Sequence, residues 1–244
     1  MLKRVKFISF IIVLCLFGFT SCETNDSKVQ EKTKEVSIGG ITYCLDYTES
    51  YYYVDDAEDS IVEAHIVDYI EGVPVTKIGT ADAGDLTTKP FEYCEKLEKV
   101  YIPNTITVIG HDAFEGCSSL EEIILPDSIT VIGYDAFSYC TSLKTIYMSK
   151  NLKEIGGTAF ECCDFTEIII PRGVTEIGYR AFINCNLLTT LYLPKSLKEI
   201  DKMAFWDCPI ETIYYEGSEN DWNQIKIWEY NDNLEVTYFN SYKK

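Results

Sequence analysis

Histidine and basic residues are scarce in this sequence, and both shortages restrict what the protein can do. The 244 residues include two histidines and 21 lysines and arginines, against 39 aspartates and glutamates. The resulting net charge of −18 gives a surface that repels phosphate backbones. We therefore expect no nucleic-acid partner.

Catalytic motifs are also missing from the sequence. It has no nucleophile elbow, no Walker loop, no HExxH motif and no paired-cysteine zinc spacing. We expect no catalytic residue, no cofactor and no metal, and an enzyme, such as a carbohydrate-active one, is the weakest functional alternative. The acidic run Asp55–Asp59 has enough carboxylates for a calcium ion but lacks the DxDxDG arrangement, so a solvated turn is favoured there.

The apolar stretch at residues 7–19 is too short for a membrane-spanning helix, which needs about 20 apolar residues. It follows a basic segment made of Lys3, Arg4 and Lys6. A short apolar run behind a basic segment is the arrangement of a secretory signal peptide. The sequence therefore predicts export.

The next segment, Phe19-Thr20-Ser21-Cys22, resembles the bacterial lipobox. The resemblance implies that residues 1–21 are a lipoprotein signal peptide and that the Cys22 thiol carries a lipid that holds the protein on a bacterial membrane. Ordinary cleaved secretion and an uncleaved anchor are the alternatives. Residues 22–35 are too polar to fold by themselves and predict a flexible tether.

One phenylalanine and one cysteine recur through the rest of the chain. The phenylalanines are 22 or 23 residues apart, and a cysteine follows each of them by three residues: Phe91, Phe114, Phe137, Phe160, Phe182 and Phe205, with Cys94, Cys117, Cys140, Cys163, Cys185 and Cys208. A period of this length is typical of a solenoid, in which each repeat forms one coil stacked on the next.

Each coil follows the template LxxIxLPxSITxIGxxAFxxC. In the copy at residues 120–140, Ile123 and Leu125 alternate with exposed positions, as in a strand. Pro126 ends that strand, and Gly133 predicts a corner with a backbone conformation that most residues resist. The phenylalanine of each copy is expected in the interior.

The repeated cysteines allow two interpretations. Stacked strands lie about 4.8 Å apart, which is within the range of Cα separations found in disulfides. Side chains stacked in parallel, however, hold their Cβ atoms farther apart than the ~3.8 Å that a disulfide prefers. A ladder of buried thiols is therefore favoured over disulfides, and Cys162, beside Cys163, is expected to be the more exposed thiol.

The repeats resemble the BspA-like class of bacterial leucine-rich repeats. The segment VTEIGYRAFINC at residues 174–185 and its siblings carry the resemblance, which covers about residues 71–216. It implies a leucine-rich-repeat right-handed superhelix, mainly β with short helical or 3-10 turns. It also implies a secreted or surface-attached protein, in a family that includes adhesins and has no common catalytic residues.

The regions on either side of the repeats predict caps. Residues 36–74 are expected to form a β-rich N-terminal cap, with strands at 41–54 and 61–70 paired across the acidic turn 55–60. Residues 75–216 form about six coils, and residues 217–244 form a C-terminal cap. In that cap Ser218 is expected to cap a short helix containing Trp222 and Ile225, and residues 234–239 to form a closing strand.

One row of outward positions recurs in the first strand of every coil. It consists of Tyr101, Ile124, Tyr147, Ile169, Tyr192 and Tyr214, beside a second row of Lys99, Glu122, Thr145, Glu167, Thr190 and Thr212. Aligned tyrosines offer rigid contact area for a ligand. The same residue types also suit strands and stabilise one another across the ladder. Both interpretations can hold together.

These observations predict a cell-surface or periplasmic lipoprotein that acts as a protein-binding or adhesion module through the Tyr/Ile row. The expected partner is a protein or glycan on a host or neighbouring cell. The main alternative is a structural envelope protein with no specific ligand.

Overall fold

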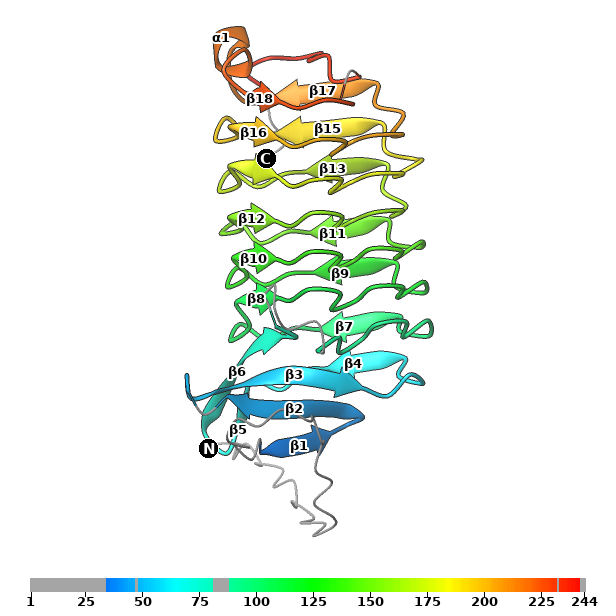
Figure 1. The fold of residues 1–244 in the computed structure, drawn as a ribbon, viewed down its shortest axis with the longest axis vertical. Coiled ribbons are helices and arrows are strands. Elements are labelled where there is room, and N and C mark those ends of the chain that lie inside the picture. The colour runs from blue at the N-terminus through cyan, green and yellow to red at the C-terminus, as the bar shows by residue number, and fades with distance from the viewer. Residues whose placement is uncertain (1–33, 47, 81–87, 232, 242–244) are drawn as a thin grey trace, which may run out of the picture. The chain divides into compact units, whose positions relative to one another are not determined.

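The computed structural model describes residues 34–46, 48–80, 88–231 and 233–241. These residues form a β-solenoid of about seven turns, stacked as parallel coils (Figure 1). The predicted repeat solenoid is therefore confirmed. The proposed signal peptide, Cys22 and most of the proposed tether lie outside the described residues.

One long sheet runs along the coils. Its order is β1 (Glu35–Ile38), β2 (Ile41–Asp46), β3 (Tyr51–Ala57), β6 (Val73–Ile78), β8 (Val108–Ile109), β10 (Val131–Ile132), β12 (Glu154–Ile155), β14 (Glu176–Ile177), β16 (Glu199–Ile200) and β18 (Lys226–Ile227), with β5 (Tyr69–Ile70) beside β6. From β3 onward the main path is parallel, because each coil repeats the direction of the previous one.

The first strand of each coil lies on another face, the divided face, which is split into three short sheets. They are β4 (Glu63–His65) with β7 (Lys99–Tyr101), then β9 (Glu122–Ile124) with β11 (Thr145–Tyr147), then β13 (Glu167–Ile169), β15 (Thr190–Leu193) and β17 (Thr212–Tyr215). All of these pairs are parallel and in register.

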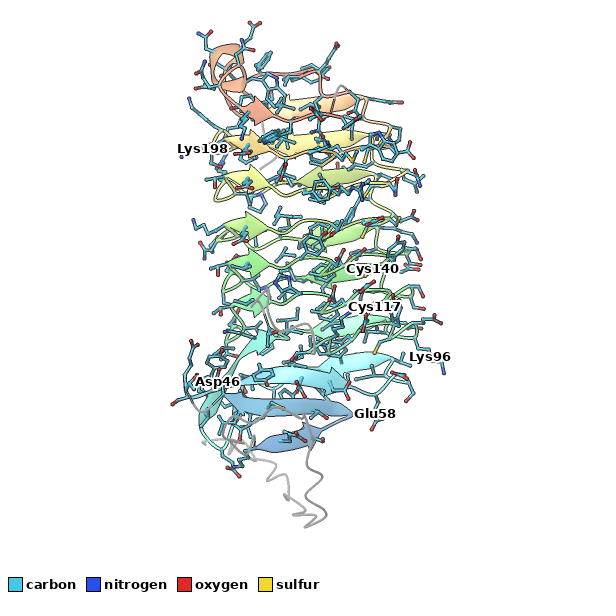
Figure 2. All side chains as sticks on the ribbon, viewed as in Figure 1. Asp46, Glu58, Lys96, Cys117, Cys140 and Lys198 are labelled. Carbon is cyan, nitrogen blue, oxygen red and sulfur yellow. The ribbon has the colours of Figure 1, made fainter. Side chains whose placement is uncertain are left out.

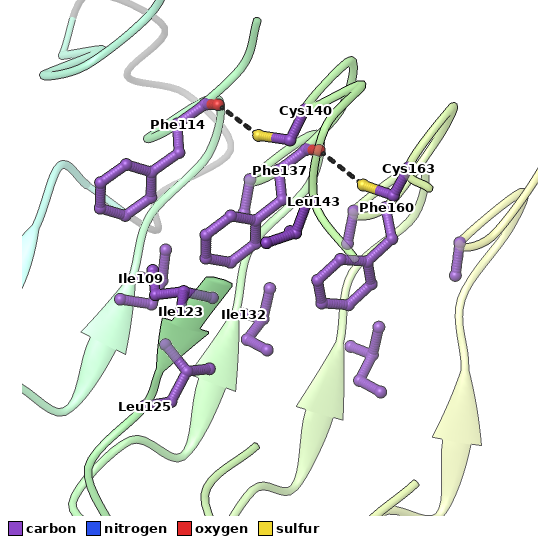
Figure 3. Close-up of a cluster of buried hydrophobic side chains, with 14 of the residues drawn as sticks. Ile109, Phe114, Ile123, Leu125, Ile132, Phe137, Cys140, Leu143, Phe160 and Cys163 are labelled. Carbon is purple, nitrogen blue, oxygen red and sulfur yellow. Dashed lines mark hydrogen bonds between the residues drawn. The ribbon is translucent and has the colours of Figure 1, made fainter. Parts of the chain in front are cut away.

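The repeated phenylalanines form one continuous stack in the interior. All six are 0% exposed. Successive rings are 5.0–5.5 Å apart between centroids and within 16° of parallel (Figure 3). Stacked rings at this spacing exclude water and contribute more than their buried area alone. The central prediction from the repeat, a shared dry interior, is confirmed.

At the corner around each phenylalanine from Phe114 onward, one residue on either side has left-handed backbone conformation, such as Asp135 (φ 54°) before Phe137 and Tyr139 (φ 57°) after it. These residues prevent a helix from propagating, so the expected short turns are single bonded turns such as Cys140 N–H to the Phe137 carbonyl. The N–H groups of residues 135, 137 and 139 donate instead to the next coil, at 2.8–3.1 Å. The backbone ladder thus continues around the corner.

The repeated glycines have a different role from the one predicted. Gly110, Gly133, Gly156 and Gly178 do not have positive φ values. A Cβ atom on Gly133 would lie 2.7 Å from the carbonyl carbon of Gly110, and one on Gly156 would lie 2.6 Å from that of Gly133. The prediction of a strained corner at these positions is wrong, because glycine is needed there for close approach between coils.

The repeated cysteines are buried free thiols (Figure 2 labels Cys117 and Cys140 on successive coils). Each thiol from Cys117 onward donates to the carbonyl oxygen of a phenylalanine in the previous coil, for example Cys140 to Phe114 at 3.1 Å (Figure 3). Burial raises the pKa of Cys140, which keeps this thiol protonated as a donor. The favoured thiol ladder is confirmed, and Cys162 is the more exposed thiol of its pair.

The N-terminal strands pair differently from the prediction. β2 and β3 form the antiparallel hairpin, and the side chain of Asp46 accepts hydrogen bonds from the backbone of Thr48 and Glu49 at its turn. Asp55 and Asp56 belong to β3 and not to a turn, because the pairing with β2 continues past an irregularity at Asp55 to Asp56 and Ala57. β4 pairs with β7 on the other face, so the predicted partner of residues 61–70 is wrong.

The C-terminal cap agrees in part with its prediction. Ser218 caps α1 (Glu219–Trp222) with a capping box, and Ile225 is buried just beyond the helix. The predicted closing strand at 234–239 is reduced to one bridge between Tyr214 and Tyr238. The Thr237 and Tyr238 N–H groups both donate to the carbonyl of Ile213, and the Tyr215 N–H donates to the carbonyl of Tyr238.

Candidate functional site

The predicted Tyr/Ile row lies on the divided face. Register places Ile124 beside Tyr147, and Ile169 beside Tyr192 and then Tyr214. Tyr101, Ile124 and Tyr147 are 49%, 60% and 55% exposed, while the other three members are partly exposed. We call these six residues the outer row.

Two residues that the sequence did not assign extend the outer row. His65 lies in register with Tyr101 at one end, and Tyr238 bridges Tyr214 at the other. The sequence contains a sign that His65 belongs to this row. Residues 75–79 (VTKIG) match the ITxIG part of the repeat template, and in the template a first strand with an outward row position precedes that part. Five extra residues before that segment, where β5 pairs with β6, concealed the match.

The outer row has two kinds of packing. Toward the C-terminus the rings of Tyr192, Tyr214 and Tyr238 stack continuously, with centroids 4.8 and 4.9 Å apart. Toward the N-terminus His65 and Tyr101 stack at 4.3 Å, and the row then alternates between isoleucine and tyrosine. Where tyrosines follow one another, ring faces cover ring faces. Where isoleucine intervenes, a ring face is left beside a smaller side chain.

The neighbouring row differs in charge between its two ends. Glu63, Lys99 and Glu122 carry charges at the N-terminal end, while Thr190 and Thr212 are neutral at the other end. A hydrogen bond with the carboxylate of Glu63 raises the pKa of Tyr101. The N-terminal part of the face is therefore the part suited to a charged ligand.

A groove of about 930 Å³ opens on the face between β7 and β9. Its lining comes from two successive coils and from the turn of a third: Glu98, Lys99, Val100, Tyr101, Ile102, Ser119, Glu121, Glu122, Ile124 and Ser142. A smaller hollow of about 440 Å³ lies beside the long sheet, over Gly156 and Gly157 and between Tyr134 and Tyr179. Both volumes lie in the range of ligand-binding clefts.

Other candidate sites have less support from the structure. Within the described ranges, no three histidine, cysteine, aspartate or glutamate side chains gather closely enough to hold a metal ion. Asp55 and Asp56 lie at an irregularity of β3, where the pairing with β2 shifts by one residue between Val54 and Asp56. No helix in the described part of the chain is long and apolar enough to cross a bilayer. His111 accepts a hydrogen bond at Nδ1 from the Tyr134 N–H.

Several solved structures are similar to this chain. A leucine-rich repeat protein from Bacteroides ovatus has 23% identity and a TM-score of 0.54, covering 79% of this chain and 66% of that one. One from T. pallidum has 25% identity and a TM-score of 0.51, covering 84% and 86%. One from Eubacterium ventriosum has 21% identity and a TM-score of 0.51, covering 75% and 43%. These likenesses show the fold.

This chain covers different shares of the three solved proteins. The chain spans most of the T. pallidum protein, about two thirds of the Bacteroides ovatus protein and less than half of the Eubacterium ventriosum protein. No curated protein matches the chain.

A family model described as a BspA type leucine rich repeat region with six copies matches residues 85–240. The match covers more than half of the chain and contains all six repeated phenylalanines, from Phe91 to Phe205. The chain therefore belongs to the BspA-type leucine-rich repeat family.

Proposed function

We propose that the protein is an exported surface lipoprotein that binds a protein or glycan partner through the outer row. The observation that carries the proposal is the row itself, in which exposed tyrosines and isoleucines are held in register by parallel strands. Aromatic side chains on a rigid element bind at low entropic cost, because little freedom is lost on contact.

The binding proposal is tested with the double variant Tyr147→Ser and Tyr192→Ser. Both positions are on the outer row, so the variant should lose binding to the matrix proteins, glycans or cells that the wild-type protein binds. Tyr139→Ser is the matched control, because Tyr139 is 47% exposed but lies at the corner before Cys140. Equal binding by the double variant and the wild type would reject the outer row as the binding face.

The anchor proposal concerns Cys22. Its support is the basic segment, the apolar run and the small residues that precede this cysteine. Cys22→Ala should abolish incorporation of a labelled fatty acid and release the protein from the membrane fraction. Continued labelling of the variant would contradict Cys22 as the lipidated residue, and loss of labelling without release would show that the lipid is not what holds the protein on the membrane.

A structural envelope protein is the second candidate, favoured by the continuous stack of Tyr192, Tyr214 and Tyr238. Stacked rings stabilise a ladder without any ligand. If that role is the main one, the double variant unfolds more easily while binding is unchanged. We assign the protein no enzymatic activity, in keeping with a repeat family that is typically non-enzymatic.

A further inference from the structure

The groove on the divided face has an aromatic wall. One face of the Tyr101 ring stacks on His65, with centroids 4.3 Å apart and planes 11° from parallel. His65 belongs to the preceding coil. The opposite face of the Tyr101 ring is therefore directed along the outer row, toward Ile124 of the next coil. Ile124 is shorter than a tyrosine and 60% exposed, which leaves this ring face open to a ligand.

The groove also carries excess negative charge. Three carboxylates line it, from Glu98, Glu121 and Glu122, against the single ammonium of Lys99. Lys144 pairs with Glu121 at 3.6 Å from outside the lining. The three carboxylates therefore exceed the two ammonium groups near the groove by one, and the whole chain adds its charge of −18. Such a potential attracts a cation and repels an anion.

The strand pattern explains why the groove lies at this place. β7 pairs with β4 and β9 pairs with β11, so the groove lies at the division between two short sheets. Side chains of the two sheets, including Lys99 and Glu122, form its two sides. The groove is thus built by the fold and is wide enough for a side chain of a partner.

We propose that this groove binds an arginine side chain of a protein partner, with the guanidinium stacked on Tyr101 and paired with the carboxylates of Glu98 and Glu122. The proposal rests on the proposed function and names the chemistry that part of the face recognises. A planar guanidinium fits an open ring face and pairs with carboxylates in a fork geometry, which a lysine ammonium cannot reproduce. Neutral glycans gain nothing from the charge excess.

The test uses NMR titration of the full-length protein with the tripeptide acetyl-Gly-Arg-Gly-amide. Its neutral counterpart has citrulline in place of arginine and nearly the same shape. The arginine peptide should cause saturable shifts at Val100, Tyr101 and Ile124, and the citrulline peptide should bind at least about tenfold more weakly. The lysine peptide should fall between them, and added salt should weaken the arginine complex.

Two matched pairs of variants locate the site. Ile124→Tyr fills the groove with the residue that neighbouring coils carry at that position, so it should fold and weaken arginine binding by about tenfold or more. Leu187→Tyr makes a similar change at an exposed position that belongs neither to the outer row nor to the groove, and it should leave binding of the arginine peptide unchanged. Glu98→Gln with Glu122→Gln should weaken binding similarly, while Glu167→Gln should not.

Three results would overturn the proposal. They are equal shifts with the citrulline peptide, unchanged binding by folded Ile124→Tyr, and shifts centred on Gly157 and Tyr179 in the smaller hollow. The failure is distinguishable from that of the proposed function, which depends on Tyr147 and Tyr192. If the tyrosine variants lose partner binding while the arginine peptide causes no shifts in the groove, the outer row remains the binding face and only the arginine site is rejected.

Discussion

The interior of the solenoid and its outer row follow opposite rules. In the interior, each coil carries the same phenylalanine at 0% exposure and, in the described coils after the first, the same thiol bonded to the previous coil. On the outer row, tyrosine and isoleucine alternate as far as Tyr192 and tyrosines then follow one another, a histidine lies at the other end, and the neighbouring charges change along the row.

This difference has a physical cause. An interior side chain packs against its copies above and below, so a change in one coil leaves a cavity or a clash in two. An outer side chain contacts its neighbours on two sides and water on a third, so different residues cost little. In this protein, positions that carry the same residue in every coil are therefore the packed ones, and positions whose residue changes from coil to coil are the ones available for recognition.

The largest expected effect breaks the interior stack. Phe137→Ala removes a ring that lies 5.2 Å from Phe114 and 5.5 Å from Phe160, and it should lower the free energy of unfolding by about 3–5 kcal/mol. Denaturant unfolding followed by circular dichroism measures the change. A loss below about 1 kcal/mol would mean that the coils do not share this core.

A smaller effect is expected at the thiol ladder. Cys140→Ala removes a buried donor to the Phe114 carbonyl and a small volume of packing, for a loss of about 1–2 kcal/mol. Cys162→Ala is the control, because its thiol is partly exposed and should cost close to nothing. Equal losses at the two positions in the same unfolding experiment would contradict a structural role for the ladder.

A pH-dependent effect of opposite sign is expected at the corner. Burial, with the nearby carboxylates of Asp112 and Glu161, raises the pKa of Asp135 to about 6. The folded state therefore binds this proton more tightly than the unfolded state. Below about pH 4 Asp135 is protonated in both states and costs no stability, and the cost grows as the pH rises through the folded-state pKa.

Asp135→Asn should therefore stabilise the protein at neutral pH, by roughly 1 kcal/mol after solvent screening, and change little below about pH 4. Melting curves across this pH range measure the difference. Asp112→Asn is the matched control, because Asp112 pairs with Lys89 at 3.3 Å and its loss should not stabilise. A stabilisation of Asp135→Asn that is independent of pH would contradict the titration.

The smallest effect is expected on the outer row. Tyr214→Ser breaks contacts with Tyr192 and Tyr238, each worth about 0.2–1 kcal/mol across a ladder. Its free energy of unfolding should therefore fall much less than that of Phe137→Ala. A loss as large as that of the core variant would remove the contrast between the two regions and favour the structural role of the row.

Several features were predictable from local pattern. The spacing of Phe114, Phe137 and Phe160 predicts stacked coils, and the alternation of Ile123 with Ile124 predicts which side chain is buried and which is exposed. Both features depend on side chains a fixed number of residues apart, which sequence displays directly. The partner of β4 was not predictable, because the hairpin signal near Asp55–Asp59 competes with a coil that departs from the template.

The sequence by itself determined the solenoid, its register and the composition of the outer row, because a period repeated six times leaves one consistent stacking. Tertiary structure alone decided the function of Gly133, the donor role of the thiols and the position of the groove. Those features depend on distances between coils, such as the 2.7 Å that a Cβ on Gly133 would have to Gly110, and on where the strand pairing is divided. No residue pattern within one coil encodes a distance to the next.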